Sequence, residues 1–358
     1  MRAAIFLETG QELSLEDVTA LAPGPRDVIV HTDASGVCHS DQSLIERMPG
    51  GNPMIIGHEG CGTVEWVGAE VTRVRPGQRV IIALTPVCGR CWFCLHQETH
   101  LCEMFGEVFA RRRAERADGS TANAMSGVGS FSDMMTVDEA QCVPVETDLP
   151  ADQLALIGCG FTTGFGAAVN TAAVTPGSTV AVIGCGGVGT AAIQGARVAG
   201  AARIIAIDPL EMKRQSAMHF GATDVIDPTA DDPVEQVRAL TGGRGVDFAF
   251  EVVGAEALQT QALQMTRRGG TTVFVGIAGG GQFVLPTLQL CMEDRTVKGS
   301  YYGSARVLRD FPRFIELIES GRVDLGGMVT KHFSLEEVNR AIDAMRNGEV
   351  VRGVLVGA

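Results

Sequence analysis

Four cysteines lie close together in the stretch CGRCWFCLHQETHLC, at Cys88, Cys91, Cys94 and Cys102. Four thiolates at this spacing can surround one zinc ion in a tetrahedral structural site that has no open position. A C-x₂-C-x₂-C run also begins a bacterial iron–sulfur motif, but that motif continues x₃-C-P. Here Glu103, not proline, follows the fourth cysteine. The spacing therefore favours structural zinc, with an iron–sulfur cluster or uncoordinated thiols as alternatives.

Three more residues of zinc-binding types, Cys38, His58 and Cys159, are scattered along the chain. Two thiolates and an imidazole can hold zinc with a fourth position open to water or a substrate, which is how catalytic zinc is bound. Spacing along the chain does not by itself bring these three together. The remaining cysteines are interpreted as small, buried, apolar residues: Cys61, Cys142, Cys185 and Cys291.

A glycine-rich turn forms a third group. Thr179–Ile183 is a short β-branched run without charge, which is typical of a strand buried on both faces of a parallel sheet. Gly184, Gly186 and Gly189 follow as G-x-G-x-x-G, and Gly187 begins an Ala-rich helical run. Glycines here let the backbone turn tightly, approach a pyrophosphate and pack the helix on the strand, with the phosphates at the helix N-terminus.

The sequence around this turn strengthens the prediction. A second strand is expected at Arg203–Ile207, and Asp208 stands at its end. A carboxylate at this position accepts hydrogen bonds from a ribose 2′-hydroxyl and repels a 2′-phosphate, so NAD is favoured over NADP. The alternative is a glycine-rich turn of some other α/β domain.

Composition narrows the class of protein. A chain of 358 residues exceeds what one core usually holds, so two domains are expected. The net charge of -13 and the 5% aromatic content argue against a nucleic-acid partner. The N-terminus shows no signal peptide, and glycines and Pro176 break the longest uncharged stretch, so no membrane is expected. Ten cysteines in such a chain indicate a cytoplasmic protein that uses thiols for metal binding or catalysis.

The elements that must position these residues change in character along the chain. Short β-type runs separated by turns up to about Pro150 predict a small, mostly β domain. After Ile157 strands and helices alternate, which predicts a doubly wound parallel sheet. The helices expected there cover residues 212–220, 233–240 and 257–267, and the strands cover 224–226, 246–253 and 271–277. Ser334 opens a capping box for a further helix that Gly348 closes.

Along essentially its whole length the chain resembles the zinc-dependent medium-chain alcohol dehydrogenases. The matching motifs are GVCHSD at 36–41, GHEG at 57–60, the four-cysteine loop, LIGCGFTTGFG at 156–166, GCGGVG at 184–189 and VRGVLV at 351–356. The resemblance implies a Rossmann domain over residues 161–301. It also implies a discontinuous, mostly β, GroES-like catalytic domain over 1–160 and 302–358, with the structural-zinc loop at 88–102.

The resemblance also implies roles for individual residues. Cys38, His58 and Cys159 become the ligands of a catalytic zinc, Glu59 becomes an occasional ligand, and Asp41 becomes the carboxylate that orients His58. The other implied contacts are Ser40 as acceptor of the substrate proton, His39 and Arg352 at the pyrophosphate, Thr163 near the cofactor, Lys213 at the adenosine ribose, and Val188, Val253 and Ile277 packed around the cofactor.

The resulting expectation is a homodimeric or homotetrameric enzyme with two zinc ions per chain that transfers hydride between a small alcohol and NAD. One alternative is a mycothiol- or other thiol-adduct-dependent formaldehyde dehydrogenase, because residues 174–202 and 299–322 are similar to such enzymes. Against a glutathione-dependent type, Gly106 stands where those enzymes have an arginine. Two further hypotheses are a zinc-free reductase of the same superfamily and a non-enzymatic NADH-binding protein.

One basic cluster has no role in this scheme. Arg111, Arg112 and Arg113 follow the four-cysteine loop, and Arg116 is close behind. The cluster is interpreted either as a solvated loop or as a group at the substrate entrance that favours an anionic alcohol.

Overall fold

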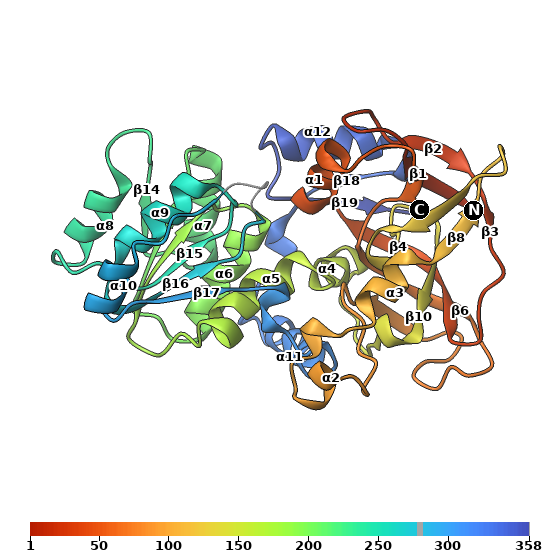
Figure 1. The fold of residues 1–358 in the computed structure, drawn as a ribbon, viewed down its shortest axis with the longest axis horizontal. Coiled ribbons are helices and arrows are strands. Elements are labelled where there is room, and N and C mark those ends of the chain that lie inside the picture. Colours follow the sequence, from red (N-terminus) through yellow and green to blue (C-terminus); the bar gives the residue numbers. More distant parts are fainter. Residues whose placement is uncertain (278–281, 358) are drawn as a thin grey trace. The chain divides into compact units, whose positions relative to one another are not determined.

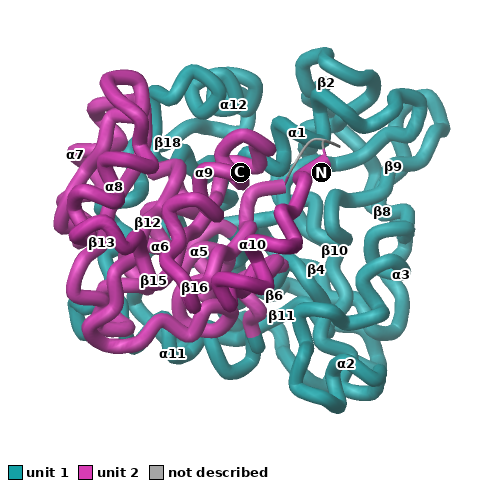
Figure 2. Tube along the Cα trace, turned by 60° about the vertical axis from the view of Figure 1, so that its left-hand side comes forward, with its two compact units in different colours: residues 1–159, 306–358 teal, residues 160–305 magenta. Residues whose placement is uncertain are grey.

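The computed structural model describes residues 1–277 and 282–357 and divides into two compact units. Unit 1 comprises Met1–Cys159 and Arg306–Ala358, and unit 2 comprises Gly160–Ala305 (Figure 2). The chain therefore leaves unit 1, builds unit 2 and returns to complete unit 1. No single helix in the described residues is long and apolar enough to cross a membrane; only the bent pair Ala151–Ile157 and Gly160–Thr171 has that length and composition when taken together.

Unit 2, coloured green to blue in Figure 1, is built on one parallel sheet. Its strand order is β14-β13-β12-β15-β16-β17. Its strands are β12 (Thr179–Ile183), β13 (Arg203–Ile207), β14 (Asp224–Ile226), β15 (Val246–Glu251), β16 (Thr266–Phe274) and β17 (Thr296–Gly299). Its α-helices are α5 (Gly160–Gly166), α6 (Gly187–Val198), α7 (Glu211–Phe220), α8 (Pro233–Leu240), α9 (Glu256–Met265) and α10 (Thr287–Met292). This order confirms the predicted doubly wound sheet, because the strand order reverses at β12.

Local sequence explains most of these elements. The strands are short β-branched runs, and Ile183, Ile205 and Ile226 from three neighbouring strands share one core with Val237 of α8 and Ala262 of α9. The helix expected to end at residue 267 ends at Met265, and β16 starts directly at Thr266.

Unit 1 contains two sheets, one ordered β2-β1-β5-β9-β8-β3 and one ordered β11-β7-β6-β4-β19-β18, with β10 also paired to β4. The first contains β1 (Arg2–Phe6), β2 (Ser14–Asp17), β3 (Thr19–Ala20), β5 (Met54–Ile55), β8 (Arg112–Glu115) and β9 (Thr121–Ala124). The second contains β4 (Asp27–Gly36), β6 (Glu59–Val67), β7 (Arg79–Ile82), β10 (Met134–Asp138), β11 (Cys142–Pro144), β18 (Val329–Phe333) and β19 (Arg352–Val356). Strand β19 pairs antiparallel with β4, so the returning segment is built into the same sheet as the N-terminal one.

The helices of unit 1 are α1 (His39–Arg47), α2 (Trp92–Leu95), α3 (Phe105–Ala110), α4 (Ala151–Ile157), α11 (Val307–Glu319) and α12 (Val338–Arg346). The predicted capping box is confirmed, because the Ser334 amide donates to Glu337 Oε2 at 3.1 Å. A 3₁₀ turn, Leu335–Glu337, separates this box from α12.

The arginine cluster is a structural part of unit 1. Arg113 is buried, and the ion pairs join Arg111 to Glu107, Asp27 and Asp138, Arg113 to Asp27, and Arg116 to Glu16 and Asp118. Because the charges of Arg111, Arg113 and Arg116 are paired within unit 1, the structure gives no support to the hypothesis of a cluster that favours an anionic substrate. Of the four arginines only Arg112 is exposed, and it begins strand β8, so the solvated-loop interpretation does not describe this cluster.

The four cysteines outside the expected metal sites differ in burial. Cys61, Cys142 and Cys185 are buried as predicted. Cys291 is exposed on α10, so its interpretation as a buried apolar residue is wrong.

Candidate metal centres and nucleotide-binding site

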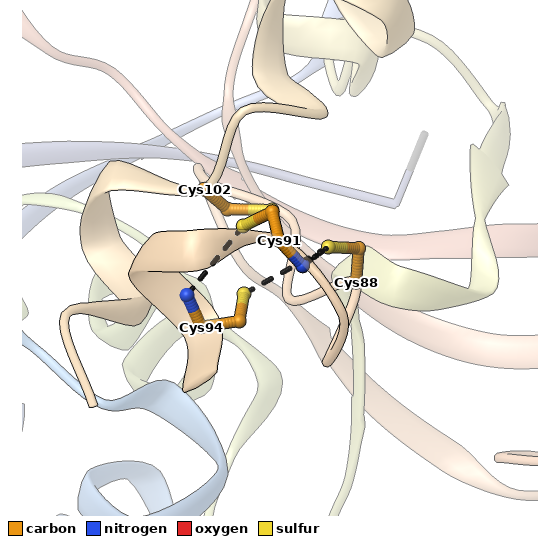
Figure 3. Close-up of side chains that lie close together, drawn as sticks. All are labelled: Cys88, Cys91, Cys94 and Cys102. Carbon is orange, nitrogen blue, oxygen red and sulfur yellow. Dashed lines mark hydrogen bonds between the residues drawn. The ribbon is translucent and has the colours of Figure 1, made fainter. Parts of the chain in front are cut away.

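The four-cysteine loop folds so that its sulfur atoms converge (Figure 3). Cys88 Sγ lies 3.9 Å from Cys94 Sγ, and Cys91 Sγ lies 3.9 Å from Cys102 Sγ. A zinc–sulfur distance of about 2.3 Å gives a tetrahedron with edges of about 3.8 Å. Four sulfurs this close together fit a single ion, whereas a cluster of several irons would hold its thiolates further apart.

Backbone amides in the loop also favour thiolates. The amide of Cys91 donates to Cys88 Sγ at 3.4 Å, and the amide of Cys94 donates to Cys91 Sγ at 3.5 Å. Although burial opposes ionisation, hydrogen bonds from the amides of Cys94 and Glu103 bring the pKa of Cys91 down to about 7. Burial raises the pKa of Cys94 and of Cys102, so zinc, which binds thiolates, would displace protons from these two when it enters the loop.

The second group brings together residues that are far apart in the sequence, and all of it lies in unit 1. Ligand atoms of Cys38, His58, Glu59 and Cys159 lie within 4.8 Å of one another, and all four residues are buried. Cys38 is the N-cap of α1, His58 directly precedes β6, and Cys159 lies just beyond the end of α4. The packing of α4 on β6 therefore brings Cys159 next to His58, which the spacing of these residues along the sequence could not predict.

Asp41 fixes the orientation of two of these residues. Its Oδ1 lies 2.8 Å from His58 Nδ1, and its Oδ2 accepts a hydrogen bond from the Cys38 amide at 2.8 Å. His58 Nε2 is buried and has no hydrogen-bond partner among the described residues. An imidazole held at one nitrogen by a carboxylate, with the other nitrogen facing two thiols, is the arrangement of a zinc ligand. The donor set therefore fits zinc.

The close packing of these four residues and Asp41 shifts the pKa values of Cys38 and His58. The Cys159 thiol donates to Cys38 and, together with His58, holds the pKa of Cys38 well below its usual value. Burial alone would lower the pKa of His58, but the Asp41 carboxylate raises it well above its ordinary value. Ser40 Oγ lies 3.7 Å from Cys38 Sγ, which places a hydroxyl beside the ligand cluster.

Arg352 has a partner that the sequence did not predict. Its Nη2 pairs with Glu59 Oε2, and both side chains are buried. Burial nevertheless raises the pKa of Glu59 to about 8. The Nε of Arg352 is buried without a hydrogen-bond partner in the described structure. Arg352 was expected at a cofactor pyrophosphate; in this structure its guanidinium contacts the carboxylate of Glu59, which belongs to the zinc-ligand cluster.

The glycine-rich turn of unit 2 requires glycine at two positions, Gly184 and Gly189, and leaves open space at Gly186. Gly184 has φ +93°, which favours glycine. A Cβ on Gly189 would lie 1.8 Å from the Gly184 carbonyl oxygen, so α6 could not pack as it does. A Cβ on Gly186 would meet open space, which leaves room for a ligand to approach the backbone at the start of α6. The turn thus has the form of a dinucleotide phosphate site.

The other expected cofactor residues of unit 2 follow the carboxyl ends of neighbouring parallel strands. Asp208 follows β13 and accepts hydrogen bonds from the amides of Cys185, at 2.8 Å, and Leu210, at 2.9 Å. Val253 and Ile277 follow β15 and β16 and are 53% and 70% exposed. Exposed apolar side chains at this edge of the sheet provide surface that a nucleotide would cover.

The remaining expected cofactor residues are divided between the units. Half-buried Val188 and Lys213 lie on α6 and α7, Gly187 begins α6, and Thr163 lies on α5, all in unit 2. His39 is exposed on α1 in unit 1.

The chain was compared with known proteins. The family model "Alcohol dehydrogenase GroES-like domain" matches residues 24–147, and "Zinc-binding dehydrogenase" matches residues 187–320. The class-3 alcohol dehydrogenase of Myxine glutinosa is 36% identical, covering 99% of this chain and 97% of its own. The NDMA-dependent alcohol dehydrogenase of Amycolatopsis methanolica is 35% identical over 99% and 98%.

A solved structure of an alcohol dehydrogenase has the same fold. Benzyl alcohol dehydrogenase from Acinetobacter calcoaceticus superposes with a TM-score of 0.92 at 29% identity, covering 100% of this chain and 99% of that one. Fold and metal-binding residues thus define a zinc-binding dehydrogenase with a GroES-like and a Rossmann part. The chain belongs to the zinc-dependent medium-chain alcohol dehydrogenase family, and the protein is an oxidoreductase.

Proposed function

We propose that the protein reversibly oxidises a primary or secondary alcohol to an aldehyde or ketone, with NAD as hydride acceptor. The observation that carries the proposal is the buried group of Cys38, Cys159 and His58, whose Nε2 faces the thiols without a partner. These three residues would hold a catalytic zinc, with Glu59 as a further available ligand, and the loop of Cys88, Cys91, Cys94 and Cys102 would hold a structural zinc. When bound, the catalytic zinc supplies a Lewis acid that lowers the pKa of an alcohol.

The chain's own residues serve positioning and proton transfer. Asp41 keeps the His58 ring in one orientation and tautomer. The Ser40 hydroxyl accepts the proton that the alcohol releases and passes it on toward solvent. NAD⁺, when bound, would supply the hydride acceptor, so the balance would be alcohol plus NAD⁺ to carbonyl compound, NADH and one proton.

The main cofactor contacts would come from the glycine-rich turn and Asp208 of unit 2. The turn Gly184, Gly186, Gly187 and Gly189 faces the pyrophosphate, and Asp208 accepts from the adenosine ribose. The remaining proposed contacts are His39, Thr163, Val188, Lys213, Val253, Ile277 and Arg352. The comparisons favour neither a thiol-adduct-dependent enzyme nor a non-enzymatic protein. From composition and the resemblance we also propose a cytoplasmic homodimer or homotetramer.

Elemental analysis and NADH formation with a panel of aliphatic, aromatic and thiol-adduct alcohols test the proposal. Aromatic alcohols belong in the panel because a structural neighbour is a benzyl alcohol dehydrogenase. We expect two zinc ions per chain in the unmodified protein, one for each group. Cys159→Ala should lose one zinc and the activity, whereas Cys142→Ala, at another buried cysteine, should keep both. Turnover by Cys159→Ala with one zinc would end the assignment.

A further inference from the structure

An arginine is fixed at the turn that carries the proposed ribose ligand. Arg214 lies in the first half of α7, and its Nη1 donates to the carbonyl oxygens of Asp208 at 2.7 Å and Pro209 at 2.8 Å. The side chain of Arg214 is only 15% exposed. A cationic group is therefore held against the backbone of the residue whose carboxylate we assign to the adenosine ribose.

This arginine conflicts with the cofactor choice that Asp208 indicates. In dinucleotide-binding folds an arginine near this position accommodates the 2′-phosphate of NADP. Asp208 disfavours that phosphate, Arg214 attracts it, and Lys213 adds a second positive charge on the same turn of α7. The two carboxyl oxygens of Asp208 accept from the amides of Cys185 and Leu210 and not from the guanidinium. Asp208 therefore does not pair with Arg214 through its side chain.

A second carboxylate resolves the conflict. Asp227 directly follows β14, and its Oδ2 lies 3.0 Å from Arg214 Nη2. Its Oδ1 accepts from the Thr229 hydroxyl at 2.6 Å and from the Thr229 amide at 2.9 Å. These hydrogen bonds from Thr229, with Arg214 beside them, hold the pKa of Asp227 below its usual value. The carboxylate is thus fixed in place and ionised at neutral pH.

We propose that Asp227 is a second determinant of cofactor choice: by pairing with Arg214 it offsets the charge that would otherwise attract a 2′-phosphate. The four charged groups Asp208, Asp227, Lys213 and Arg214 then sum to zero. Without the Asp227 charge they sum to one positive charge, and Arg214 is freed to turn toward a phosphate. The inference rests on the proposed function, because it takes a nicotinamide dinucleotide as the ligand.

Calorimetric titration of the full-length, zinc-loaded protein with NAD⁺ and with NADP⁺ tests this assignment without relying on turnover. Asp227→Asn keeps the shape of the side chain and can still accept from Thr229. We expect it to lower the Kd for NADP⁺ about tenfold and to leave the Kd for NAD⁺ within about threefold. Arg214→Gln should act in the opposite direction and weaken NADP⁺, so the inference can be tested even if one variant does not fold. In Asp227→Asn/Arg214→Gln the gain should vanish.

Asp224→Asn is the matched control. Asp224 begins the same strand, and its Oδ2 lies 3.3 Å from Arg203 Nε, so this variant removes an equal charge from a similar ion pair at the other end of β14. An unchanged ratio of the two Kd values in Asp227→Asn would overturn the inference. So would an equal change in Asp224→Asn, or a gain that persists without Arg214. If the unmodified protein binds NAD⁺ no better than NADP⁺, the assignment of cofactor choice fails; if it binds neither, the proposed function fails.

Discussion

Replacing Asp41 with asparagine should weaken the catalytic zinc and leave the structural zinc unchanged. Asp41 is 0% exposed and His58 1% exposed, so water cannot replace the lost carboxylate. Asparagine has one acceptor atom and no charge, whereas Asp41 serves both His58 Nδ1 and the Cys38 amide, each at 2.8 Å. A hydrogen bond to a charged group contributes about 1.5–3 kcal/mol and a neutral one about 0.5–1.5 kcal/mol. The difference is about 1–1.5 kcal/mol and the lost second acceptor adds about 0.5–1.5 kcal/mol, so zinc binding should weaken by about 1.5–3 kcal/mol, which is about 10–150-fold in affinity.

The assay is competition for zinc against a chelator, followed by elemental analysis of the protein. The four-cysteine loop provides an internal reference on the same molecule, and Cys159→Ala identifies which of the two zinc ions is released first. Asp343→Asn is a matched control, because it removes an exposed carboxylate of α12 that pairs with Arg346. The reasoning is refuted if Asp41→Asn retains both ions as tightly as the unmodified protein. Equal zinc loss in Asp343→Asn would refute it too.

Three other predictions concern the nucleotide site and the arginine cluster. Asp208→Asn should raise the Kd for NAD⁺ about tenfold and reduce the preference of the protein for NAD⁺ over NADP⁺, both measured by calorimetry. An unmodified protein that already prefers NADP⁺ would contradict this prediction. Arg113→Met should destabilise the protein by about 1–3 kcal/mol in urea unfolding, because buried Asp27 loses its closer charged partner and keeps only Arg111, at 3.4 Å. Arg112→Met, at an exposed side chain, should change stability by less than about 0.5 kcal/mol, and similar losses in the two variants would contradict the assignment. The hydrogen bond from Arg116 lowers the pKa of Glu16, so this ion pair stabilises the protein at any pH above the ordinary glutamate pKa and loses its effect as the pH falls through the lowered pKa of Glu16. Arg116→Met should therefore be less stable than the unmodified protein at neutral pH in urea unfolding. A stability difference that stays constant into acid would count against the pair.

The parts of the fold and site that the sequence predicts are those encoded locally. The four-cysteine loop and the G-x-G-x-x-G turn could be predicted because each is a short local segment whose residue spacing specifies its geometry. The ligand set of Cys38, His58 and Cys159 came only from the resemblance, since α1, β6 and α4 must pack together before these side chains meet.

Interactions between distant residues were not predicted. Glu59 and Arg352 are separated by 293 positions, and no local pattern marks them as partners. Arg113 was misjudged for the same reason, because its partner Asp27 lies 86 positions away and the local run of arginines is typical of an exposed loop. No sequence pattern marked Arg214 as a functional residue, because its partner Asp227 lies beside it only once β14 has joined the sheet.

The return of the chain to unit 1 sets an order of assembly during synthesis. The four-cysteine loop and the whole of unit 2 are complete in the nascent chain before β19 is made, whereas the sheet that contains β4 and β6 still lacks that strand. Domains generally fold as they emerge. We therefore expect the structural zinc to be captured early and the catalytic centre to mature last, when β19 delivers Arg352 to Glu59. A ribosome-stalled chain ending before residue 329 should resist protease in unit 2 and hold one zinc; two tightly held zinc ions at that stage would contradict the order. Nascent chains of this enzyme would thus carry a folded nucleotide-binding part before they can catalyse anything.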